Sequence, residues 1–175
     1  MSIRVLLFLI AFSVSLPAFA QTSIGVLDVD YIMQESKAAK ALQKKRNAAR
    51  EKLLGKLSEK ENALRKDGKA LFEKRKELGE EAFVKQSKDY EQKLLDMRKL
   101  TQKNKRNFEE ASAKAIITLR NHVSDVVADI AKEREYEVVL SKRSVIVAGN
   151  ALDITKDVLA VMDKKPLDVK FAVKD

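Results

Sequence analysis

Residues 71–83 read LFEKRKELGEEAF, and this stretch predicts a turn between two long helices. A row of leucines at intervals of seven residues ends at Leu78, and a second apolar row with the same interval starts at Phe83. Between them, Gly79 can adopt the left-handed conformation that ends a helix. The acidic residues that follow suit the first turn of the next helix. We therefore expect the tip of an antiparallel hairpin near residues 77–81.

The chain on both sides of this turn has the composition and spacing of packed helices. No proline occurs between residue 31 and about residue 134, and helix-favouring Lys, Glu, Ala, Leu and Gln dominate. The rows are Leu57, Leu64, Leu71 and Leu78 before the turn, and Phe83, Tyr90 and Met97 after it, with Leu94, Phe108 and Ala115 as a companion row. Such rows favour coiled-coil-like packing, in arms of about 70 Å at about 1.5 Å per residue. Gly68 is the second candidate for the bend.

Short β-rich runs and one short helix are expected outside the hairpin. They are strands over residues 23–29, 136–140 and 145–148, and a helix over residues 154–163. Asp153 or Thr155 can cap this helix, and Pro166 lies beyond its end. The predicted fold is α+β, mostly α, with a coiled-coil-like arm projecting from a small β-rich base. The expected parts are an arm at residues 37–110, a base at residues 21–36 and 111–163, and a loose tail at residues 164–175.

The C-terminal part of the second helix, away from the tip, predicts a core that several chains share. Of residues 111–131, 12 of 21 are apolar, so this helix should be buried on several sides. A base of roughly 70 residues is marginal alone, and three short strands leave open edges. We therefore predict an obligate homo-oligomer. The residues expected to build its base are Ile24, Val26, Ile116, Val123, Val126, Val127, Ile130, Val138, Leu140, Val145 and Val147.

The first twenty residues have the layout of a secretory signal peptide. Arg4 supplies a positive start, residues 5–16 are mostly apolar, and Ala18-Phe19-Ala20 forms a small-residue cleavage site. The apolar run is shorter than the roughly 20 residues that span a bilayer. We expect cleavage after Ala20 and export of residues 21–175.

Positive charge is concentrated in the arm. Residues 37–110 contain 23 Lys or Arg and 13 Asp or Glu, whereas the whole chain has a net charge of +9. A basic surface suggests acidic partners, namely nucleic acid, anionic lipid or acidic polypeptides, and export disfavours nucleic acid. Phe72 and Phe83 lie near the tip, where the contact between the two helices ends and apolar side chains become exposed. The residues expected to contact a guest polypeptide are Phe72, Leu78, Phe83, Lys69, Lys74, Arg75, Lys76 and Lys85.

No constellation in the sequence predicts catalysis, a cofactor or a small-molecule substrate. His122 is the single histidine, and its surroundings are those of a packed helical residue. The chain has no cysteine, so it offers no thiol chemistry and no disulfide. None of the five glycines lies in a phosphate-binding pattern. The sequence therefore predicts a non-enzymatic protein that works without ATP or metal.

Four segments carry a resemblance to a known family: IGVLDVDYIMQES at 24–36, YEVVLSK at 136–142, SVIVA at 144–148 and LDITKDVL at 152–159. Together with the helical middle, they resemble the Skp/OmpH family of periplasmic chaperones. The resemblance implies a homotrimer with a β-barrel base and three hairpins around a cavity that holds unfolded outer-membrane proteins without ATP. It leaves lipopolysaccharide or anionic lipid open as further partners. The alternative is an exported structural coiled-coil scaffold of the cell envelope without chaperone activity.

Overall fold

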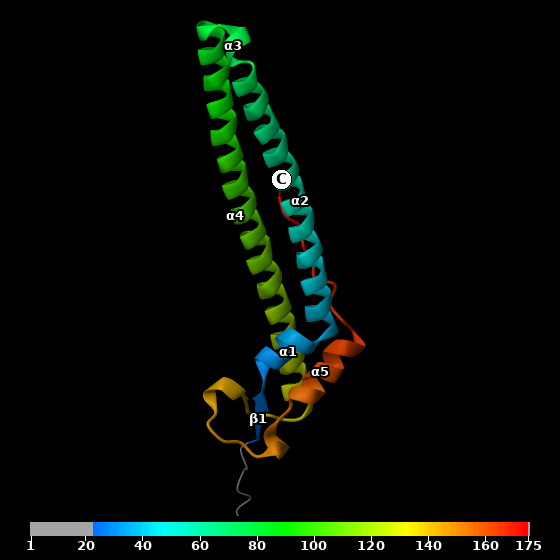
Figure 1. Cartoon of the computed structure of the whole chain (residues 1–175). Coiled ribbons are helices and arrows are strands. Elements are labelled where there is room, and N and C mark those ends of the chain that lie inside the picture. The colour runs from blue at the N-terminus through cyan, green and yellow to red at the C-terminus, as the bar shows by residue number, and fades with distance from the viewer. Residues whose placement is uncertain (1–22, 175) are drawn as a thin grey trace, which may run out of the picture.

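The computed structural model describes residues 23–174, so the expected signal peptide lies outside the described residues. Two long helices run side by side as a hairpin with the short helix α3 at its tip, and the other short elements gather at the root (Figure 1). The elements are β1 (Ile24–Leu27), α1 (Val29–Glu35), α2 (Lys37–Glu73), α3 (Arg75–Leu78), α4 (Glu80–Glu133), β2 (Val138–Ser141), two 3-10 turns (Lys142–Ser144 and Asn150–Leu152) and α5 (Thr155–Lys164). This architecture confirms the predicted α+β, mostly helical fold with a long arm on a small base.

The hairpin turn lies at Gly79, as the sequence predicts. Gly79 has a φ of 74°, a conformation that costs a side-chain-bearing residue free energy. The turn also contains the short helix α3, which is separated from α2 by a single residue, Lys74. Glu80 and Glu81 occupy the first turn of α4, where the helix dipole favours acids.

The second glycine candidate, Gly68, is a packing site rather than a bend. It is buried within α2, and a Cβ added to it would lie 2.5 Å from the hydroxyl oxygen of Tyr90 on α4. Gly55, in the same helix, has nothing within 4 Å of its added Cβ. The absence of a side chain at Gly68 therefore lets the two arm helices approach at Tyr90.

Substitution of these two glycines by Ala should have different effects on stability. Gly55→Ala is expected to raise the melting temperature of the helices, since Ala favours a helix by about 1 kcal/mol over Gly. Gly68→Ala should lose this gain because Tyr90 must move away from the new methyl group. Thermal melts followed by circular dichroism measure both variants. Equal stabilisation by the two changes would show that Tyr90 does not pack on Gly68.

The core lies at the root of the arm and joins α1, α2, α4 and α5. Its most buried large side chains include Ile32, Leu119, Ile154, Val158 and Met162. β1 and β2 form a two-stranded parallel sheet with Ile24 opposite Val138. Removing these apolar side chains from water stabilises the fold by about 25 cal/mol per Å² of buried surface. The arm is thus packed into the core at one end.

Three sequence expectations differ from the structure. The long helical zone breaks at the fully buried Ser36, whose hydroxyl oxygen accepts a hydrogen bond from the Ala39 N–H and caps α2. Residues 145–148 form no strand, and Ile146 is fully exposed. This run has β propensity but no neighbouring backbone in the described chain to pair with. The tail is not loose, because Val169 is buried in the core and is only 3% exposed.

Candidate functional site

The tip of the arm brings two aromatic rings and a guanidinium group together. Phe72 at the end of α2 and Phe83 at the start of α4 meet edge to face, with ring centroids 6.1 Å apart. The guanidinium carbon of Arg75 lies 5.0 Å from the centre of the Phe83 ring, within the range of a cation–π contact. Phe72 nevertheless remains 64% exposed. The tip therefore presents an apolar ring beside positive charge, far from the core (Figure 1).

The basic residues expected to contact a guest are exposed around this aromatic pair. They are Lys69, Lys74, Arg75, Lys76 and Lys85. The Lys69 ammonium lies 3.8 Å from Glu73, an exposed pair that contributes little stability. Within residues 23–174, Lys74, Lys76 and Lys85 have no carboxylate at salt-bridge distance. Leu78 is half-buried beside the turn.

The charge surplus of the arm lies mainly away from the tip. Residues 69–85 contain five basic and four acidic residues, whereas residues 37–68 contain eleven basic and four acidic ones. Residues 37–68, which make up most of α2, are therefore the most positive part of the arm. An acidic segment of a partner would be attracted first to this part of α2.

The seam between α2 and α4 is narrow along the arm. Leu57 and Leu71 are buried in it, and Leu64 is half-buried. Lys93 on α4 forms a salt bridge of 3.1 Å with Asp67 on α2. The leucine row thus packs between the two helices as predicted, and most other arm residues face solvent.

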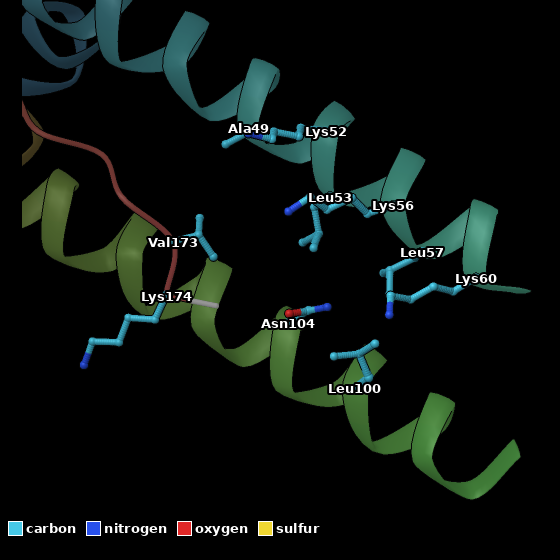
Figure 2. A pocket seen from close by; sticks show the side chains of 10 residues that line it. All are labelled: Ala49, Lys52, Leu53, Lys56, Leu57, Lys60, Leu100, Asn104, Val173 and Lys174. Carbon is cyan, nitrogen blue, oxygen red and sulfur yellow. The ribbon is translucent and has the colours of Figure 1, made fainter. Parts of the chain in front are cut away.

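Part of the seam is hollow. A cavity of 380 Å³ opens between α2 and α4 at mid-arm. Figure 2 shows Leu53 and Leu57 pointing from α2 toward Leu100 and Asn104 of α4. Four lysines also line it: Lys52, Lys56, Lys60 and Lys174. The cavity therefore combines an apolar lining with cationic side chains.

The C-terminal segment runs back from α5 along the arm toward this cavity (Figure 1). Its Phe171 ring packs edge to face on Phe108 of α4 at 5.7 Å. Lys45 donates hydrogen bonds to the carboxylate of Asp168 at 2.5 Å and to the carbonyl of Val169 at 3.0 Å. The same contact with the Lys45 ammonium holds the pKa of Asp168 below its usual range. The packing of this segment differs from the loose tail expected at residues 164–175.

The sequence of the C-terminal segment contains a pattern that indicates its packing. The alternating apolar residues Leu167, Val169, Phe171 and Val173 have the two-residue period of an extended chain with one apolar face. The expected seam residue Phe108 contacts this segment through Phe171.

The residues expected to build an oligomeric base fall into three groups in the single chain. Val26, Val123, Val126 and Ile130 are buried. Ile24, Ile116, Val127 and Val145 are half-buried. Val138, Leu140 and Val147 are exposed, Val147 by 86%. The first group forms the core of the chain, and the third leaves apolar surface uncovered at the sheet and the following loop.

A polar cluster ties β1 to the start of α5. The Asp28 N–H donates to the Thr155 hydroxyl oxygen at 2.9 Å, and the Thr155 N–H donates to the Asp153 carboxylate at 2.9 Å. The ammonium of Lys142 lies 3.3 Å from the same carboxylate. Hydrogen bonds from the side chain and backbone of Thr155, and then the nearby Lys142, hold the pKa of Asp153 below its usual range.

This pKa shift predicts an acid-sensitive contribution to stability. A carboxyl group with a lowered folded-state pKa stabilises the fold above its unfolded pKa of about 3.9, and the contribution disappears as pH falls through the folded pKa. Asp153→Asn should therefore lower the free energy of unfolding at pH values near 7 and have progressively less effect below about pH 4. Urea unfolding of both proteins across this pH range measures the difference. A constant difference at all pH values would contradict the linkage.

Metal-binding groups and membrane-spanning helices were sought among the described residues. Residues 23–174 contain no group of three or more His, Asp or Glu side chains placed to hold a metal ion. No helix among them is long and apolar enough to cross a membrane. His122 is half-buried on α4.

Comparison with known proteins identifies the family. The family described as Outer membrane protein (OmpH-like) matches residues 23–162. The chain belongs to the OmpH-like family. This confirms the resemblance carried by both ends of the sequence, and the matched range leaves out the C-terminal segment after residue 162.

A solved structure has the same fold. The crystal structure from Caulobacter crescentus CB15, described as a candidate outer membrane chaperone (OmpH-like), covers 89% of this chain and 92% of its own length. The TM-score is 0.82 at 18% sequence identity, so the likeness establishes the fold alone. No curated protein matches the chain.

Proposed function

We propose that the protein is an ATP-independent holdase chaperone of the periplasm that keeps unfolded outer-membrane proteins soluble until they are delivered. The observation that carries the proposal is the exposed aromatic and cationic tip, held far from the core on a basic arm. Membership of the OmpH-like family supports a role of the chaperone class. The secretory layout of residues 1–20 supports export.

The binding would rest on many weak contacts. Basic side chains attract acidic segments of a guest at long range, and exposed apolar groups bind its apolar side chains. Each contact is broken easily, while several arms acting together hold the guest firmly. Folding of the guest in the membrane removes the unfolded form from the equilibrium, so release needs no nucleotide.

Each chain supplies one arm, so binding by several arms requires several chains. We propose a homotrimer in which the exposed apolar residues Val138, Leu140 and Val147 are covered by neighbouring copies. The loop at residues 145–148, which has β propensity but lacks a partner strand in the single chain, would then pair with a neighbouring sheet edge. This pairing would complete the base that the sequence indicates.

The proposed activity is tested by diluting an outer-membrane β-barrel protein out of urea. Residues 21–175 should suppress light scattering by the aggregating guest without ATP. An unrelated basic protein at the same concentration is the control for charge alone. Suppression should weaken as salt is raised, since exposed charges are screened within about 10 Å at 0.1 M salt. Unchanged scattering at equimolar trimer would favour the passive scaffold instead.

A further inference from the structure

The C-terminal segment has the sequence pattern of a β-strand from a membrane barrel. Apolar residues occupy every second position, with Asp168, Lys170, Ala172 and Lys174 between them. Transmembrane β-strands alternate in the same way, because one face meets lipid and the other meets the lumen. In this chain the segment forms no strand, yet its apolar face is covered.

The apolar face of the segment lies against the seam between α2 and α4. Val169 is buried in the core, Phe171 packs on Phe108, and Val173 lines the mid-arm cavity. Polar groups of both helices bind the segment's ends: Lys45 of α2 binds Asp168, and the Asn107 side-chain amide of α4 donates to the Lys174 carbonyl at 3.0 Å. Two helices thus hold the segment by its apolar face and its backbone.

The seam continues as a hollow beyond the end of the segment. The 380 Å³ cavity begins at Val173 and is lined by Leu53, Leu57 and Leu100. A second, shallower hollow adjoins it toward the tip, and both share Lys60 and Leu100. The described segment therefore occupies the root end of a longer groove with an apolar lining.

We propose that this α2–α4 groove binds extended guest segments with alternating apolar and polar residues, and that the C-terminal segment occupies its root end as an internal stand-in for such a guest. The inference rests on the proposed chaperone function and specifies where on the arm the guest binds. A barrel strand would place its apolar side chains on the leucines, as Phe171 and Val173 are placed now. Its acidic side chains would meet the lysines of α2, as Asp168 meets Lys45.

Competition between the segment and a guest follows from this shared site. The distal part, with the half-buried Phe171 and Val173, can leave while the buried Val169 stays anchored. A site occupied by a competing segment binds its ligand more weakly, in proportion to the fraction of time it is free. Occupation for about nine-tenths of the time would weaken guest binding about tenfold.

The experiment uses variants in which the C-terminal segment no longer covers the groove. A cross-linking residue in the same protein shows where the guest binds. Phe171→Ser plus Val173→Ser removes the distal apolar face without touching Val169, and a chain ending at Lys170 is the second variant. Ala172→Ser, on the exposed face, is the matched control. A photo-crosslinking residue, p-benzoylphenylalanine, replaces either Leu53, which lines the groove, or Leu54, which is 55% exposed outside it. The probe is a fluorescently labelled outer-membrane β-barrel protein diluted out of urea.

With the segment in the groove for about nine-tenths of the time, both freed variants should bind the guest about tenfold more tightly. They should also cross-link to it more strongly from position 53. Position 54 and the Ala172→Ser control should show neither change. If the protein suppresses aggregation but cross-links equally from both positions, the groove is not the site and the chaperone function stands. Cross-linking from position 53 to a second copy of the chain would assign the groove to subunit contact. Failure of every variant to suppress aggregation would overturn the chaperone function and this inference together.

Discussion

Val126→Asp is expected to unfold the base of the protein. Val126 is 8% exposed and lies on the face of α4 that packs into the core with Leu119 and Val123. A carboxylate at this position has no buried cation to pair with among the core residues. Burial of an unpaired charge costs several kcal/mol, which is a large part of the 5–15 kcal/mol typical of a domain. Far-ultraviolet circular dichroism during heating, with light scattering for the mass, measures the effect.

Ser124→Asp is the matched control for this change. It adds the same charge two residues away on an exposed face of α4, so the melting temperature should move little. In the proposed trimer, Val126→Asp should also reduce the mass to that of a single chain. Equal melting temperatures for the two variants would place Val126 outside the core.

The local signals in the sequence were sufficient for the elements that depend on near neighbours. Gly79 followed by acids indicated the turn, since both the positive φ and the helix start are local properties. The strand before Asp28 was also indicated, and Asp28 caps α1 by accepting a hydrogen bond from the Tyr31 N–H at 2.9 Å. Burial of Val123 and Ile130 followed from the high apolar content of residues 111–131. In each case the determining residues lie within a few positions of one another.

Elements that depend on distant partners could not be predicted in this way. A strand at residues 145–148 requires a neighbouring backbone, which residues 23–174 do not supply. The break at Ser36 depends on tertiary packing as well as capping, because the Lys37 N–H donates to Asp163 near the end of α5 at 2.8 Å. The position of the C-terminal segment depends on Lys45 and Asn107, more than 60 residues away in the sequence.

The candidate site was predicted as a set of residues but not as an arrangement. Phe72 and Phe83 were expected near the tip, and the structure adds that their rings meet across the turn with Arg75 beside Phe83. The surplus charge was expected over the whole arm, residues 37–110, and most of it lies on residues 37–68. The aromatic pair therefore lies beside a few basic residues at the tip, whereas the net positive charge is greatest on residues 37–68. Long-range attraction would thus come mainly from residues 37–68, and the tip would add short-range apolar contact beside its own basic side chains.

Phe72→Ser plus Phe83→Ser is expected to weaken guest holding about tenfold or more. Phe72 is exposed in the free protein, so its ring can gain free energy by becoming buried against a guest. Burial of such a side chain contributes about 1.5–3 kcal/mol when complete, and about 1.4 kcal/mol corresponds to a factor of ten in affinity. Titration of a fluorescently labelled, urea-unfolded outer-membrane protein with each variant measures the change.

The same double change should have little effect on the fold, because the core lies at the opposite end of the arm. It removes one aromatic pair and one cation–π contact at the tip, which contribute about 0.5–1.5 kcal/mol locally, and it leaves the root residues untouched. Val84→Ser, at a neighbouring exposed apolar position outside the aromatic pair, is the control and should weaken binding much less. If the double variant binds as tightly as the parent, the guest is held elsewhere on the arm. If it melts at a much lower temperature, Phe72 and Phe83 serve mainly to close the hairpin.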